Sequence, residues 1–105
     1  MQIYVPFNDK DMVGGVSRMG DCHVYGTPTA SMAGLKADGT LYVVGHGRYS
    51  RGDQICGEVD GYLSGKRWVY LTASELAGRL ASDKLPKSFG DLRLMMCWGD
   101  TRVTQ

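Results

Sequence analysis

The stretch LYVVGHG, residues 41–47, is the most informative segment of this sequence. Its first four residues are apolar without alternation, and the turn-forming residues Asp38-Gly39 and Gly45 stand on either side of them. A short uninterrupted apolar run between turn signals is typical of a strand that is buried on both faces of a sheet. The sequence therefore predicts a central strand over 41–44, with His46 just past its carboxyl end.

Two strands and a helix are predicted before this run. Residues 2–7 alternate between apolar and polar side chains, which indicates a strand, and 22–25 form a second, short one. Between them, residues 8–20 are polar and glycine-rich, and they predict a loop or a short irregular helix. Pro28 opens a predicted helix, because proline is tolerated in the first helical turn, and Gly39 is placed to end it.

A hairpin, a helix and a last strand are predicted after the run. Residues 55–59 and 67–71 pair as a hairpin or small flap. Thr72 and Glu75 match a capping box, which begins a helix of about ten residues. Residues 92–97 form a second buried-type strand. This order of elements predicts an α/β fold in which helices flank a small, mostly parallel sheet with a β-hairpin flap.

Length, charge and cysteine content restrict the class of protein. A chain of 105 residues is expected to form a single domain, 1–105. Its 12 Lys and Arg nearly balance 11 Asp and Glu, which argues against nucleic acid as a partner. No apolar run approaches the ~20 residues that span a bilayer, so no membrane partner is expected. Without a secretory signal, three cysteines predict free thiols and a cytoplasmic location, or export by a signal-peptide-independent route.

Two predicted strands end in side chains that can carry chemistry, His46 and Cys97. Ligands of open parallel sheets bind beyond the carboxyl ends of the strands, so neighbouring strands would bring both residues to one crevice. A thiolate is a nucleophile, and an imidazole can take the thiol proton and later protonate a leaving amine. Gly47 has no Cβ, so its N–H can approach a substrate carbonyl oxygen, and the N–H of Cys97 is the natural second oxyanion donor. The pattern predicts a catalytic dyad.

These motifs resemble the caspase-like cysteine peptidases, which include caspases, metacaspases, clostripain, gingipains and the self-cleaving cysteine protease domains of large bacterial toxins. One apolar strand ends in His46-Gly47 and another in Cys97-Trp98-Gly99, with a separation of 97 − 46 = 51 residues. In caspases the histidine precedes the cysteine by about 50 residues. Met95-Met96 stand where caspases have Gln-Ala, and the helix that begins at 71–76 looks most like the toxin-type domains. The likeness covers mainly residues 40–99.

The resemblance implies a caspase-like fold and the activity of a cysteine endopeptidase. The likeness to the toxin domains, which cleave their own chain, implies a bacterial thiol protease that processes itself. His46 would be the general acid and base and Cys97 the nucleophile. The N–H groups of Gly47 and Cys97 would form the oxyanion hole. The partner would be a peptide or protein substrate, extended along the sheet edge and hydrolysed through a thioester acyl-enzyme. No cofactor, no metal and no third orienting residue are expected.

The chain departs from the resembling peptidases after the cysteine. Their domains continue for two or more strands, whereas this chain ends six residues after Gly99. Three interpretations stay open at this point: a minimal version of the fold, a second chain that completes it, or a large-subunit-like fragment of a processed precursor.

Candidates for substrate binding rest on their positions near the strand ends. Asp9 and Asp11 follow the first strand, which in the resembling peptidases contributes to the specificity pocket. There they would favour a basic residue before the scissile bond. Arg48 and Trp98 directly follow the two strand-end motifs, so each could border the cleft. The simpler interpretation makes the acids solvated loop residues and Trp98 a packing residue.

Two alternatives to an enzyme stay open. A free cysteine on a strand is most often a small buried hydrophobic residue, so the chain could be a structural α/β domain with inert cysteines. It could also be a non-catalytic caspase-like module that binds peptides or regulates a partner. The other thiols predict no site: Cys22 and His23 point to opposite faces of a strand, and Cys56 is expected to be exposed. The sequence has no paired C-x₂-C spacing, so no zinc site is expected.

Overall fold

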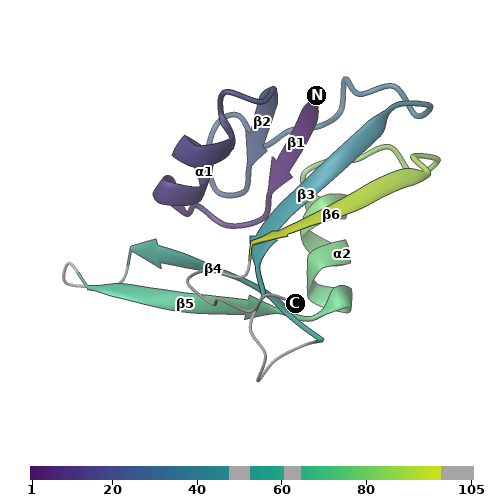
Figure 1. The fold of residues 1–105 in the computed structure, drawn as a ribbon. Helices are drawn as coiled ribbons and strands as arrows, with labels where there is room; N and C mark the ends of the chain where they lie inside the picture. The colour runs from purple at the N-terminus through teal and green to yellow at the C-terminus, as the bar shows by residue number, and fades with distance from the viewer. Residues whose placement is uncertain (48–52, 61–64, 98–105) are drawn as a thin grey trace.

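The computed structural model describes residues 1–47, 53–60 and 65–97. Within them, six strands form one sheet of order β2-β1-β3-β4-β5, and β6 also pairs with β3 (Figure 1). Neither of the two helices in these residues is long and apolar enough to cross a membrane. In chain order the elements are β1 (Gln2–Val5), α1 (Lys10–Val16), β2 (Asp21–Val24), β3 (Thr40–His46), β4 (Ile55–Asp60), β5 (Lys66–Leu71), α2 (Ala73–Ser82) and β6 (Asp91–Cys97).

Parallel and antiparallel pairing meet at β3. Strand β1 lies between β2 and β3 and is parallel to both, and β6 runs parallel to β3 along its whole length. Strand β4 is antiparallel to β3 and pairs with it through His46 and Cys56. Strand β5 returns antiparallel to β4, and Figure 1 shows this hairpin extending away from the four parallel strands.

A mostly parallel, caspase-like sheet flanked by helices is therefore the wrong prediction for this chain. The described residues form a small mixed α/β domain in which strands predominate and only two helices occur. The helix expected between Pro28 and Gly39 is absent, and turns take its place. Thr27 Oγ1 donates to Val24 O at 2.8 Å and accepts the N–H of Thr29 at 3.3 Å. Such local side-chain bonds compete with the hydrogen bonds of a helix.

The predicted hairpin and the capped helix are confirmed. Strands β4 and β5 occupy the two expected segments within one residue at each end. Helix α2 begins after a complete capping box, in which Thr72 Oγ1 accepts the N–H of Glu75 at 3.2 Å and Glu75 Oε1 accepts the N–H of Thr72 at 2.8 Å. These two elements depend on residues close together in the chain, which is why their sequence signals are reliable.

Apolar side chains form one cluster on each face of the sheet. The cluster beneath α1 includes Ile3, Val5 and Val44, and the cluster on the opposite face, beneath α2, includes Tyr4 and Leu41. Strand β3 contributes to both clusters, as expected of a central strand. Strand β1 does so too, so the predicted alternation of buried and exposed side chains in it is wrong.

Strand β6 is less buried than its sequence predicts. Leu92 and Leu94 are 43 and 63 % exposed, although both belong to an apolar run. Among the described residues β6 pairs with β3 alone, so it forms an edge of the sheet there. An apolar run therefore indicated a strand correctly but overstated its burial.

The buried Tyr4 predicts how the stability of the protein changes at alkaline pH. Its hydroxyl donates to Asp83 Oδ2 at 2.5 Å, and burial together with this carboxylate raises the pKa of Tyr4 strongly. The unfolded chain releases this proton above about pH 10, whereas the native state retains it. We expect the free energy of unfolding to be unaffected by this group below that pH and to fall above it.

Urea denaturation at a series of alkaline pH values tests this expectation. A Tyr4→Phe variant should lose about 1–3 kcal/mol at neutral pH, because Asp83 loses a donor, and should show a shallower alkaline decline. Thr72→Ala, which destabilises the protein through the N-cap of α2 and keeps Tyr4, serves as the control and should retain the wild-type decline. Equal alkaline slopes in Tyr4→Phe and wild type would contradict the assignment.

Candidate functional site

The carboxyl ends of β3 and β6 lie side by side in the sheet. Their parallel register runs from Thr40 paired with Asp91 to His46 paired with Cys97. Residues paired across neighbouring strands lie on the same face of a sheet. The register therefore places the two sequence-predicted catalytic positions next to each other, although 51 residues separate them in the chain (97 − 46).

The row of paired residues that contains His46 and Cys97, here called the His46 row, continues into β4. His46 pairs with Cys56 on its other side, and Cys56 Sγ donates to His46 O at 3.4 Å. Cys56 is only 1 % exposed, so the expectation of an exposed thiol there is wrong. Two cysteine positions thus flank His46, and the one on β4 is inaccessible to a substrate.

Asp9 approaches His46 from the loop between β1 and α1. The residue is 3 % exposed, and its carboxylate is the N-cap of α1: Oδ1 accepts the N–H of Met12 at 3.0 Å. Oδ2 accepts the N–H of Glu58 at 2.8 Å and lies 3.6 Å from His46 Nε2. One buried carboxylate therefore connects α1, β4 and the candidate histidine. Asp9 was predicted as a substrate-binding residue, and its position as a helix cap beside His46 was not predicted.

The imidazole of His46 has one ring nitrogen near a carboxylate and one that has no partner in the described part of the chain. Nδ1 is buried and makes no hydrogen bond among the described residues. The ring of Trp68, from β5, meets the imidazole edge-on with centroids 5.5 Å apart. Buried polar atoms without partners are rare in folded proteins, and each such case needs an explanation. Within the described residues, Nδ1 at the end of β3 therefore has no partner that would occupy its lone pair or its proton.

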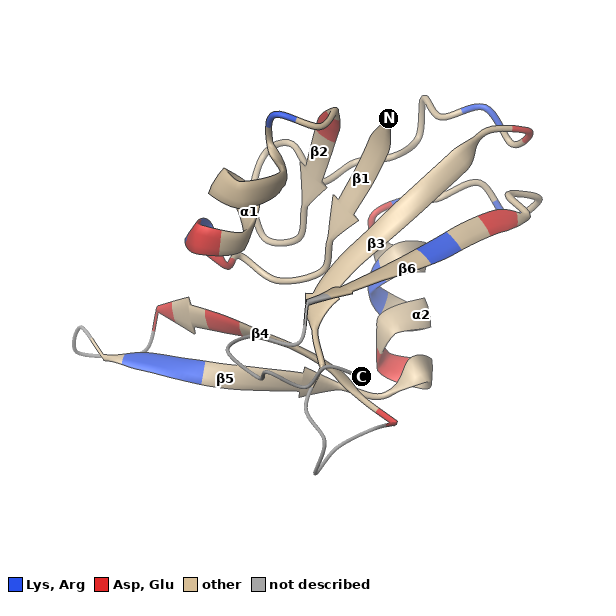
Figure 2. Cartoon of the chain, in the orientation of Figure 1, with Lys and Arg blue, Asp and Glu red and all other residues tan. Residues whose placement is uncertain are grey.

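Ion pairs connect α1 to the β4–β5 hairpin beside this site. Lys66 Nζ lies 3.4 Å from Asp11 Oδ2, and Lys10 Nζ lies 3.3 Å from Asp60 Oδ2. The hydrogen bond that Lys66 donates to Asp11 raises the pKa of Lys66. Figure 2 shows acidic residues on α1 and β4 and basic residues at the start of β5. Asp11 is therefore an exposed residue beside the site, and its negative charge is paired with Lys66.

Several of the sequence-predicted residues have no description in the structure. Arg48 and Trp98 lie outside the described residues, as does the side chain of Cys97. Gly47 is described, and it is buried directly after the end of β3. The geometry of the site accordingly rests on Asp9, on the whole of His46 and on the backbone register of Cys97.

The second thiol and imidazole pair forms no comparable arrangement. Both ring nitrogens of His23 have partners, Gln2 Oε1 at 2.8 Å and Ser31 O at 3.1 Å. Burial, with a smaller contribution from Asp21, raises the pKa of the Cys22 thiol, which favours the unreactive protonated form. Over the described part of the chain, no group of three or more His, Cys, Asp and Glu residues could hold a metal ion.

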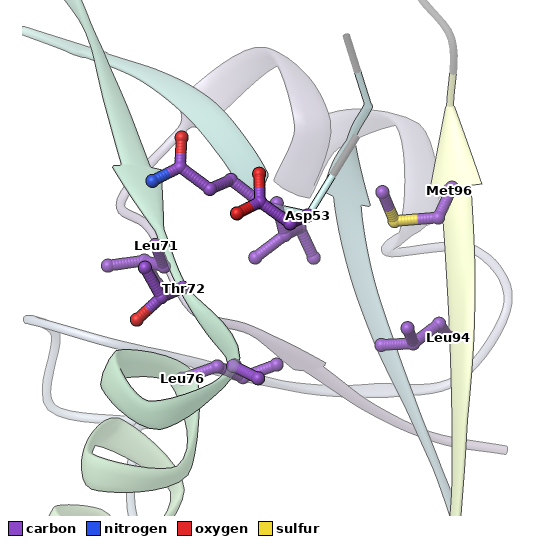
Figure 3. Close-up of a pocket in the computed structure, with 9 residues that line it drawn as sticks. Asp53, Leu71, Thr72, Leu76, Leu94 and Met96 are labelled. Carbon is purple, nitrogen blue, oxygen red and sulfur yellow. The ribbon is translucent and has the colours of Figure 1, made fainter. Parts of the chain in front are cut away.

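A separate concavity lies on the opposite face of β6. Its volume is about 180 Å³, and Figure 3 shows Leu94 and Met96 facing Leu71 and Leu76 across it. Leu94 and Met96 alternate with Cys97 along the strand, so the pocket and the His46 row are on different faces. The pocket is walled mainly by apolar side chains.

No family model, curated protein or solved structure matches this chain.

Proposed function

We propose that this protein is a cysteine endopeptidase that uses Cys97 as nucleophile and His46 as general acid and base. The observation that carries the proposal is the pairing of these two residues in the parallel register of β3 and β6. A thiol needs a base within reach to become a thiolate, and neighbouring positions on one sheet face provide that proximity. The substrate class is peptides or protein segments in an extended conformation.

The reaction follows from the chemistry of the two groups. His46 takes the thiol proton, and the thiolate of Cys97 attacks the carbonyl carbon of the scissile peptide bond. The N–H groups of Gly47 and Cys97 are the proposed donors to the oxygen that becomes negative. Protonation of the leaving amine by His46 breaks the C–N bond and leaves a thioester, which water hydrolyses with His46 as base.

The proposed chemistry does not require the fold of the peptidases that the motifs resemble. The same catalytic groups recur on unrelated folds, so an active site is identified by geometry and roles. In this chain the resemblance to caspase-like peptidases supports the choice of residues, while the mixed sheet shows that the surrounding fold differs. We therefore propose a shared dyad chemistry on another architecture.

A second candidate function is peptide binding without catalysis. Leu94 is 63 % exposed on a strand that forms an edge of the described sheet, and it lines the apolar pocket of β6. Edge strands bind extended peptides through main-chain hydrogen bonds, and neighbouring pockets accept side chains. Under this alternative, a Cys97→Ala variant would retain every activity of the protein.

Thiol labelling tests whether Cys97 is activated. Iodoacetamide at near-neutral pH, followed by peptide mapping, should label Cys97 at least about ten-fold faster than Cys22 or Cys56. Cys56 is protected by burial, and burial raises the pKa of the Cys22 thiol. A His46→Gln variant should remove the advantage of Cys97. Equal slow labelling of all three cysteines would reject the dyad.

A further inference from the structure

We propose that Asp9 is the positioning residue of His46: it holds the imidazole in the tautomer with the proton on Nε2, which leaves the Nδ1 lone pair available. The catalytic meaning of this tautomer rests on the proposed function, whereas the tautomer itself does not. Neither the dyad pattern nor the resemblance calls for an orienting acid. The contacts around Asp9 point to this role.

Asp9 is held rigidly by two elements that are distant in sequence. Its Oδ1 accepts the N–H of Met12, which fixes it to the first turn of α1, and its Oδ2 accepts the N–H of Glu58, which fixes it to β4. Two N–H donors on two oxygens are the pattern of an ionised, acceptor-only carboxylate. At 3 % exposure, little water competes with its negative charge. Asp9 is therefore a fixed anion rather than a mobile loop residue.

The position of this anion selects the tautomer of His46. Asp9 Oδ2 lies 3.6 Å from Nε2, which is an electrostatic contact longer than a normal hydrogen bond. With the proton on Nε2, the positive end of the N–H dipole points at the carboxylate, which is attractive. With a lone pair on Nε2, that lone pair would face the lone pairs of Asp9 Oδ2, which is repulsive. A neutral imidazole carries one proton on its two nitrogens, so Nδ1 is left as the acceptor.

The surroundings of Nδ1 agree with this assignment. The atom is buried and has no hydrogen-bond partner among the described residues, so a proton there would be an unsatisfied buried donor. Trp68 packs edge-on against the ring and restricts its rotation. The backbone of His46 is held by β6 on one side and by β4 on the other. In the proposed peptidase, Nδ1 is then the atom that receives the thiol proton.

Nuclear magnetic resonance measures the tautomer directly. Long-range ¹H–¹⁵N correlation spectra of the full chain, at a pH where both histidine rings are neutral, distinguish a protonated nitrogen from a bare one. The signals of His46 are identified by their loss in a His46→Gln variant. We expect the Nε2–H form to predominate in the wild type. A predominant Nδ1–H form would overturn the proposal whether or not any variant folds.

The Asp9→Asn variant tests the cause. An asparagine retains one oxygen for the N-cap but replaces the other with an NH₂ group, which faces both Nε2 of His46 and the N–H of Glu58. A donor opposite Nε2 should shift His46 toward the Nδ1–H form. The proposed activity should then fall about 10²–10⁴-fold in kcat, because the lone pair points away from the thiol. Thr72→Ala, which removes the N-cap of α2, is the matched control and should leave the tautomer unchanged.

The outcomes separate this inference from the proposed function. An unchanged tautomer in Asp9→Asn would overturn the positioning role. If the tautomer shifts as expected but Cys97 shows neither rapid labelling nor hydrolysis, Asp9 positions His46 and the peptidase proposal fails. Faster labelling of Cys97 in the wild type than in Asp9→Asn supports both.

Discussion

Replacing Cys97 with serine is expected to reduce peptide hydrolysis by about 10³-fold or more, because the hydroxyl is a much weaker nucleophile than the thiolate. His46→Gln should cause a loss of similar size, and the double variant should be little worse than either single one. Residues that act in one step are not additive. The measurement is cleavage of a peptide library followed by mass spectrometry.

The chain offers a closely matched control for this experiment. Cys56 is the other cross-strand partner of His46, and its thiol is buried and donates to the His46 carbonyl. A Cys56→Ser variant keeps a donor to that carbonyl, so it should remain active. Activity that survives Cys97→Ser but disappears in Cys56→Ser would assign the nucleophile to β4 instead. Activity that survives both would exclude the two cross-strand partners of His46 as the nucleophile and reject the proposed dyad.

The same substitution, glycine to alanine, is expected to change stability in opposite directions at two positions. At Gly57 in β4, an added Cβ would lie 2.5 Å from Cγ and 2.9 Å from Cβ of Phe7. Phe7 is almost completely buried, so its ring cannot move aside without a backbone shift. Overpacking of this kind costs about 1–3 kcal/mol. Gly57→Ala should therefore lower the free energy of unfolding by about that amount.

Gly78 is the matched control for this prediction. It lies inside α2 and is exposed, and outside the backbone of α2 no atom of the described residues lies within 4 Å of an added Cβ. Alanine in a helix interior is more stable than glycine by about 0.5–1 kcal/mol, so Gly78→Ala should stabilise the protein. Urea denaturation of both variants measures the difference. A Phe7→Leu substitution in the Gly57→Ala background should recover part of the loss, and no coupling between the two sites would contradict the packing assignment.

Most of the strands and α2 could be predicted from short-range sequence signals. The capping box at Thr72 located the start of α2, and the apolar run before Gly45 located β3 within two residues at each end. Helix α1 was not distinguished from a loop, because Gly14 and Gly15 weaken its helical propensity. It is fixed instead by the Asp9 cap and by the packing of Met12.

Some residues of the candidate site could likewise be predicted from local motifs, and others could not. His46 and Cys97 could be named from their motifs, because each directly follows or ends an apolar strand. The contact between Asp9 and His46 could not be named, since the two residues are joined only by the arrangement of α1, β4 and β3. Nor did any local pattern indicate that Trp68 of β5 would border the imidazole.

Short-range chemistry was thus sufficient to locate most strands, the capped helix and the two candidate residues, because periodicity, turns and caps involve neighbours in the chain. The mixed sheet, the exposed edge at β6 and the environment of His46 follow from strand pairing over long sequence separations. Pairing depends on which apolar faces pack together and which backbone groups find partners. Those energies are set by the whole folded chain, and no single segment contains them.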